Sequence, residues 1–312
     1  QRRPPQHPRQ FNLLDAVFHQ NDLMLHIAGL LPIKDFISLY CISKRFHFLV
    51  NSHYTTYMKA LARANAPNAM KVYPAAAYQS LCIRDPVLRA HPQNKAEPRW
   101  VPGLRWVQMI AYREQVVHDI LLCMAMEGHH FPPFIPIVIM KIWALLDHGW
   151  NGPRVALVHD ETLFPDAILL VGLMFFIKLD MRFSDPVKGN GETSIRRLML
   201  AQRSLTVLNQ VLRRQCLTSR LEMLQMMVRH DHKPLIANTK KLPIMGVPAE
   251  LVGGLSREGW GTGKNRLLRP DELILRECVR RKLAVHRAFA DYMVWGYTDY
   301  NTMKEVGVPD LK

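Results

Sequence analysis

Cysteine is scarce in this sequence, and long apolar runs are missing. The 312 residues include five cysteines, and no two of them are close neighbours in the sequence. Because a disulfide scaffold needs an even and closely spaced set, we expect reduced thiols and a cytoplasmic and/or nuclear protein. The longest apolar run, residues 167–177, is too short to span a bilayer and predicts a buried helix with no membrane association.

Strand patterns and internal repeats are missing as well. No stretch alternates convincingly between apolar and polar residues, and no repeat of 20–50 residues is visible. The sequence therefore gives no support for leucine-rich repeats or propellers. The apolar share is nevertheless 48%, which is enough for a packed core. We therefore expect an all-α protein, with a short N-terminal module of three helices followed by a larger helical domain.

Proline divides the chain into segments. We expect residues 1–10 to be a disordered lead and residues 11–64 to form a first module. Prolines recur every six to twelve residues over 65–103, which prevents long helices and predicts an irregular connector with short helical turns. Residues 104–312 form the larger all-α domain.

Helical periodicity and start signals place six helices in that larger domain. Thr193 is a good cap, and Pro165 and Pro270 precede acidic residues that suit a helix start. One apolar stripe follows helical spacing at Leu198, Ala201, Leu205, Leu208 and Leu212. The predicted helices are Leu104–Glu127, Pro136–His148, Pro165–Asp180, Thr193–Cys216, Ser219–His230 and Pro270–Gly296.

The formal net charge of +15 is unevenly distributed. Residues 193–312 hold 21 Lys and Arg against 11 Asp and Glu. A basic surface of this kind meets nucleic acid, an acidic protein or anionic lipid, and most often it is only a solvated face. A basic helical nucleic-acid-binding protein is the alternative that this charge leaves open.

Three short helices fit residues 22–50. They run from Asp22 to about Leu30, from Asp35 to Cys41 and from Ser43 onward, with Asp35 and Ser43 as predicted caps. Two-turn helices are marginal alone and need tertiary packing. The segment holds more large apolar residues than so small a bundle can enclose, so we expect some of them to face a partner.

The spacing of this segment resembles the F-box family. An acid, two aliphatics and the later aliphatic, acidic, basic and aromatic positions of that pattern all find a matching residue type, while His19 and Gln20 occupy the usual Leu-Pro slot. The matching residues are Asp22, Leu23, Met24, Ile27, Leu31, Asp35, Phe36, Leu39, Ile42, Ser43, Lys44 and Phe46. The segment 180–191, DMRFSDPVKGNG, is also similar to helical regions of filamentous-fungal F-box proteins of unknown target.

The resemblance implies a non-catalytic substrate receptor of a ubiquitin ligase. Such a receptor binds a Skp-family adaptor, and through it a cullin, and holds an unidentified protein target near the charged enzyme. A helix-turn-helix DNA reader is a rival, but its third helix would present apolar residues where base-reading polar ones are needed. The residues implied to contact the adaptor are Leu23, Met24, Ile27, Leu31, Pro32, Asp35, Phe36, Leu39, Ile42 and Phe46.

Other motifs favour no enzyme, cofactor or metal. The loop 259–264, GWGTGK, lacks the first glycine and the final Ser or Thr of a phosphate-binding loop, so a flexible basic loop is expected. His230, His232 and the pair His129-His130 have no second group of ligands at metal spacing. The basic helix and aromatic residues near the end suggest a target surface, for which we name Arg280, Arg281, Tyr292 and Trp295.

Overall fold

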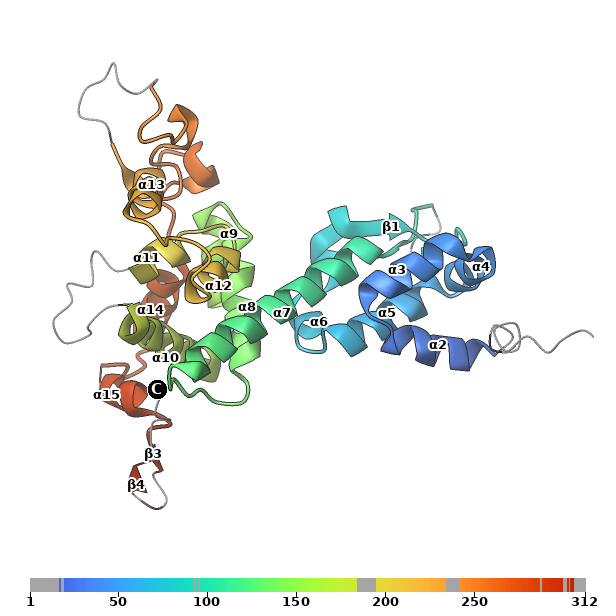
Figure 1. Ribbon diagram of the computed structural model, residues 1–312, viewed down its shortest axis with the longest axis horizontal. Coiled ribbons are helices and arrows are strands. Elements are labelled where there is room, and N and C mark those ends of the chain that lie inside the picture. Colours follow the sequence, from blue (N-terminus) through green and yellow to red (C-terminus); the bar gives the residue numbers. More distant parts are fainter. Residues whose placement is uncertain are drawn as a thin grey trace, which may run out of the picture. The chain divides into compact units, whose positions relative to one another are not determined.

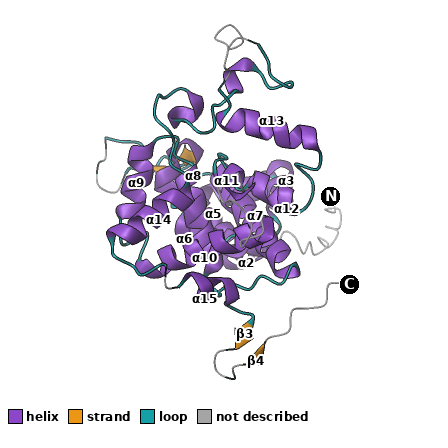
Figure 2. Ribbon diagram, turned by 90° about the vertical axis from the view of Figure 1, so that its left-hand side faces the viewer, coloured by secondary structure: helices purple, strands orange, loops and turns teal. Residues whose placement is uncertain are grey.

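The computed structural model is mostly helical, with 63% of the residues that it describes in helices (Figures 1 and 2). It describes residues 17, 20–91, 94, 96–183, 195–233, 242–286, 288–299, 302 and 304–305. The expected lead, residues 1–10, lies outside this range. The chain divides into two compact units, residues 1–113 and 114–312, and each is described by itself.

Four consecutive helices open the first unit (Figure 1): α2 (Asn21–Leu30), α3 (Ile33–Ile42), α4 (Lys44–Ser52) and α5 (Tyr54–Asn65). The three short helices predicted for residues 22–50 correspond to α2, α3 and α4. Ser43 caps α4 as expected, since its side chain accepts a hydrogen bond from the Phe46 amide at 3.2 Å. The prediction that Asp35 caps the second helix was wrong: α3 starts earlier, after Pro32, and Asp35 lies in its first turn, where a carboxylate favours the positive helix end.

Aromatic side chains form the centre of the first unit. Phe36 and Phe46 are fully buried and meet edge to face at 5.3 Å, and Tyr57 packs against Phe46 at 6.3 Å. Helix α2 contributes Met24 and Ala28, both buried. Helix α5 packs against α2. These contacts explain how helices of about ten residues become stable.

Residues 65–103 contain short helical turns, as the prolines predicted. Helix α6 (Ala69–Val72) is followed by the 3-10 helix η1 (Ala75–Leu81). Two short strands that the sequence did not predict, β1 (Cys82–Arg84) and β2 (Trp100–Pro102), then pair antiparallel. Gly103 is required at the end of this pair, because a Cβ there would lie 2.6 Å from the Leu81 carbonyl oxygen.

Helix α7 (Leu104–Met126) follows, and further helices build the second unit. The core of the second unit is apolar, and α10 lies against α8, α14 and α15. The apolar run 167–177 lies within α10 and is largely buried, as predicted. The main helices of this unit are α8 (Ile135–Leu146), α9 (Asn151–His159), α10 (Asp166–Phe183), α11 (Ile195–Leu200), α12 (Thr206–Leu212), α13 (Arg220–Asp231), α14 (Pro270–Arg280) and α15 (Phe289–Val294).

Two predicted long helices are each interrupted. The one predicted for 193–216 is split into α11 and α12 by turns over 201–205, although its apolar stripe is buried as expected. The one predicted for 270–296 ends at Arg280, after which Lys282 adopts a left-handed conformation with φ 59°. Thr193 lies outside the described residues. Helix α9 and the strand pair β3 (Thr298–Asp299) and β4 (Lys304–Glu305) were not predicted.

Candidate functional site

An apolar stripe on α2 faces solvent. Leu23 is 44% exposed and Leu30 is 72% exposed, and Ile27 lies between them at half-buried depth. Their spacing of four and three residues places them on one side of the helix. Met24 and Ala28 lie on an adjoining side of the helix, which is buried. Helix α2 therefore carries two apolar faces, and the first unit covers only one of them.

The next two helices also expose large apolar side chains. Ile42, the last residue of α3, is 80% exposed, and Phe48 of α4 is 77% exposed. Single exposed apolar residues are common on soluble surfaces. Here four strongly exposed residues come from one stretch of 26 residues, Leu23 to Phe48. Such a concentration is typical of surfaces that bind a partner.

The structure separates the predicted adaptor contacts into two groups. Met24, Phe36 and Phe46 are buried and hold α2, α3 and α4 together, so they do not offer a surface. The remaining predicted contacts are exposed or half-buried and are accessible to a partner: Leu23, Ile27, Leu31, Pro32, Asp35, Leu39 and Ile42. Leu30 and Phe48 were not in the predicted set. Both are large apolar residues, which could have marked them as candidate contacts, but the F-box pattern does not include their positions.

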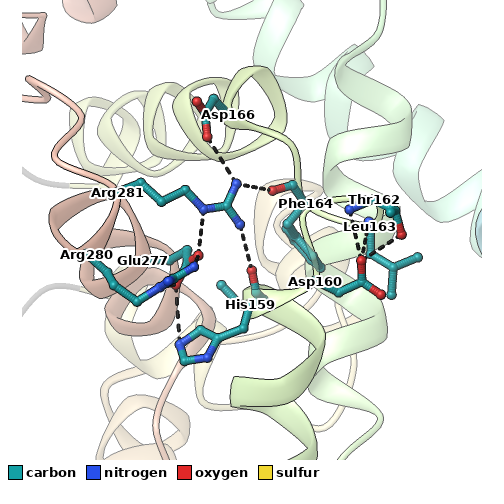
Figure 3. Close-up of polar contacts among 10 residues, drawn as sticks. His159, Asp160, Thr162, Leu163, Phe164, Asp166, Glu277, Arg280 and Arg281 are labelled. Atoms are coloured by element: carbon teal, nitrogen blue, oxygen red, sulfur yellow. Dashed lines mark hydrogen bonds and ion pairs between the residues drawn. The ribbon is translucent and has the colours of Figure 1, made fainter.

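The predicted target contacts Arg280 and Arg281 meet the carboxylate of Glu277 (Figure 3). The Arg281 side chain is only 8% exposed, and its Nε donates to Glu277 Oε1 at 2.6 Å. Its Nη1 donates to the Phe164 carbonyl oxygen at 2.8 Å and to Asp166 Oδ1 at 3.0 Å, and its Nη2 donates to the Val158 carbonyl oxygen at 3.3 Å. Arg281 therefore connects α14 to the segment between α9 and α10 within the second unit. Arg280 is half exposed and accessible.

Glu277 is the centre of this polar cluster. Its side chain is 1% exposed, and both oxygens accept hydrogen bonds from Arg280, at 2.6 and 2.8 Å. His159 Nε2 approaches Oε2 at 3.3 Å. These hydrogen bonds, first from Arg280 and then from Arg281, lower the pKa of Glu277 to about 2. The cluster joins α14 to α9 and to the start of α10.

Trp295, one of the predicted target contacts, lies beside a buried lysine. Lys178 Nζ donates to the carbonyl oxygens of His130 at 2.5 Å and Trp295 at 2.6 Å. The same Nζ atom lies near the centres of three aromatic rings, at 5.1 Å from Tyr297, 5.3 Å from Phe131 and 5.5 Å from Trp295. Burial lowers the pKa of Lys178 to about 8. Trp295 therefore contacts Lys178 within the second unit, through its ring and through its carbonyl oxygen, which accepts a hydrogen bond.

Tyr292 lines an open, mainly apolar cavity of about 530 Å³. Its walls come from α10, α14 and α15, and a charged group of Asp180 and Arg196 lies at one side, with Arg196 Nε 2.9 Å from Asp180 Oδ1. The structure does not bring Tyr292 into the polar cluster of Arg280 and Arg281. The four predicted target residues therefore lie in different surroundings and form no single surface.

The residues that the structure describes were compared with the requirements of a metal site and of a membrane span. Among them there is no group of three potential metal ligands, and no helix is long and apolar enough to cross a membrane. No family model, curated protein or solved structure matches the chain.

Proposed function

We propose that this chain is a non-catalytic substrate receptor of a cullin–RING ubiquitin ligase. Helices α2, α3 and α4 serve as an F-box-like module that binds a Skp-family adaptor. The second unit holds a protein target. The proposal is supported above all by the apolar stripe of α2, which presents Leu23, Ile27 and Leu30 to solvent on a folded module with the F-box spacing.

The division of buried and exposed residues supports this interpretation. A partner-binding helical module needs one set of apolar residues for its own core and another for the interface. Phe36 and Phe46 belong to the first set. Leu30 and Ile42 belong to the second, and both are more than 70% exposed. Burying such side chains in an interface contributes about 1.5–3 kcal/mol each.

The mechanism requires no reacting group on this chain. Tethering a target beside the ubiquitin-charged enzyme raises the local concentration of its lysines and turns a bimolecular encounter into an effectively intramolecular one. Hydrogen bonds from Arg280 and Arg281 account for the lowered pKa of Glu277, and burial accounts for that of Lys178.

The test is binding of the purified full chain to a recombinant Skp-family adaptor, measured by calorimetry. We expect the wild type to bind with micromolar or tighter affinity. The double variant Leu30→Asp/Ile42→Asp should bind at least about 100-fold more weakly, because two apolar contacts worth about 3 kcal/mol or more together are lost and two charges are desolvated.

Leu88→Asp is the matched control. Leu88 lies in the same unit, is 76% exposed, and is outside the proposed interface. The control should bind the adaptor as the wild type does, and circular dichroism should show the same helix content for all three proteins. Absence of adaptor binding by the wild type, or equal binding by the double variant, would refute the proposal.

A further inference from the structure

A second surface, in the unit of residues 114–312, collects basic side chains around one cavity. The cavity has a volume of about 310 Å³ and opens to solvent. We call it the basic pocket. Its lining comes from the ends of α11 and α13, from the loop of residues 256–266 and from the residue before α14: Arg197, His230, Asp231, Lys233, Ser256, Arg257, Lys264, Arg266 and Arg269.

The charges of the basic pocket are only partly compensated from within the protein. Six of its lining residues are Lys or Arg, against one Asp. Arg269 is paired with Asp271 at 3.0 Å, and Arg266 with Glu272. In the part of the chain that the structure describes, no carboxylate pairs with the exposed side chains of Lys233, Arg257 or Lys264.

The basic loop is held in place by its backbone. Arg257 and Arg266 face each other across an antiparallel bridge, and the Leu267 amide donates to the Ser256 carbonyl oxygen at 2.8 Å. The buried Glu258 accepts from the Asn151 amide at 2.9 Å and from the Asn265 side chain at 3.0 Å. Because of these anchors, Arg257 and Lys264 extend from a defined turn and their charges stay near the pocket.

The wall of the pocket at the end of α13 is also held by backbone hydrogen bonds. The Leu255 and Ser256 amides donate to the Arg229 and His230 carbonyl oxygens, at 3.1 and 2.9 Å, and so complete the last turn of α13. His230 is buried, and desolvation lowers its pKa. Lys233 follows directly after this turn. The pocket thus joins segments that are far apart in sequence, and their like charges repel one another unless an anion is present.

We infer that the basic pocket binds the phosphate group of a phosphate monoester. A monoester carries nearly two negative charges near neutral pH and three terminal oxygens that accept hydrogen bonds. Arg and Lys donors converging from several segments match that compact charge, and hydrogen bonds between ionised partners are the strong ones. The site lies in the second unit and does not depend on the proposed adaptor binding.

A nucleic-acid backbone suits the pocket less well. A phosphodiester carries a single charge, and a nucleic acid spreads its charges along a strand, for which proteins offer an extended basic track. Here the cations surround one cavity. Proteins that bind single strands also stack bases on aromatic side chains, and the described lining contains no Phe, Tyr or Trp.

The experiment is calorimetric titration of the full chain at low ionic strength with four probes. These are inorganic phosphate, a phosphoserine peptide of neutral sequence, the same peptide without phosphate, and a single-stranded DNA oligonucleotide. We expect phosphate and phosphopeptide to bind, and the unmodified peptide not to bind. Tighter binding of the phosphopeptide than of phosphate points to a modified protein as ligand, and equal affinities point to a small phosphorylated molecule; both outcomes support the site.

Two double variants decide whether binding occurs in the pocket. Arg257→Gln/Lys264→Gln removes two exposed cations of the lining, and we expect at least about tenfold weaker binding of both phosphate probes. Arg220→Gln/Arg276→Gln removes two exposed cations elsewhere on the same unit, and binding should stay within about twofold of the wild type.

Three results would overturn the inference. The first is no phosphate or phosphopeptide binding by the wild type at low ionic strength. The second is an equal loss in both double variants, which would mean a general charge effect. The third is binding of the DNA oligonucleotide without binding of either phosphate probe, which would assign the surface to nucleic acid. Circular dichroism of the variants separates loss of binding from loss of folding.

Discussion

Replacing Glu277 by Gln tests whether the buried polar cluster stabilises the second unit. The change keeps the size of the side chain and removes its charge. Arg281, only 8% exposed, then lacks its closest carboxylate partner, whereas Arg280 is half exposed and recovers hydration. Breaking a buried ion pair by removing one partner costs about 3–5 kcal/mol. Because Arg281 keeps its carbonyl and Asp166 contacts, we expect about 3 kcal/mol.

The pH dependence of this difference follows from the pKa of Glu277. Hydrogen bonds from Arg280 and Arg281 lower that pKa from 4.5 to about 2. The folded protein thus favours the ionised carboxylate, and the stabilisation is fully present above about pH 4.5 and is lost as the pH falls towards 2. At about pH 3.5 the gap between wild type and Glu277→Gln should shrink by about 1 kcal/mol.

Urea unfolding followed by circular dichroism measures both quantities, at neutral pH and at about pH 3.5. Arg280→Gln is the companion variant: Arg280 is exposed and recovers hydration, so its loss should cost much less than that of Glu277. A cost for Glu277→Gln below that of Arg280→Gln would refute the assignment of Glu277 as a buried centre. A gap that does not change with pH would refute the role of its charge.

Three further predictions concern folding. Lys178, whose pKa is lowered from 10.5 to about 8, binds fewer protons in the folded than in the unfolded state between these values, so the stability of the wild type relative to Lys178→Met should rise over that pH range in urea titrations. Phe46→Ala should cost about 3–5 kcal/mol because the ring is fully buried, while Ile42→Ala at 80% exposure should cost less than about 0.5 kcal/mol; similar thermal shifts for both would contradict the division into core and surface. Gly103→Ala should cost about 1–3 kcal/mol, since its Cβ would lie 2.6 Å from the Leu81 carbonyl oxygen, and an unchanged melting temperature would show that this joint relaxes freely.

The N-terminal helices were predictable because their signals are local. Ser43 precedes an apolar stretch and caps α4, and the breaks at Pro32 and Ser43 separate the three helices. Which apolar residues face outward was not predictable. Met24 and Leu23 are adjacent and both hydrophobic, yet one is 3% exposed and the other 44%, because only the position of neighbouring helices decides which side of α2 is covered.

The candidate site in the second unit was predicted less well. Arg280 and Arg281 look alike in sequence, but the helix ends between them and directs Arg281 towards Phe164 and Asp166. Arg281 is separated from Phe164 and Asp166 by more than a hundred positions, and no local rule reveals such pairings. The basic loop was recognised as basic, but the convergence of Lys264 with Lys233 and Arg197 was not.

By itself, the sequence determined the helical class, the apolar stripes and the short N-terminal helices with the F-box spacing, since periodicity, caps and prolines act over a few residues. Only the tertiary structure decided where the long predicted helices are interrupted, which of Arg280 and Arg281 is internal, and which cations share one pocket. These depend on contacts between distant segments, whose energies compete with local helix preference and exceed it where side chains are buried.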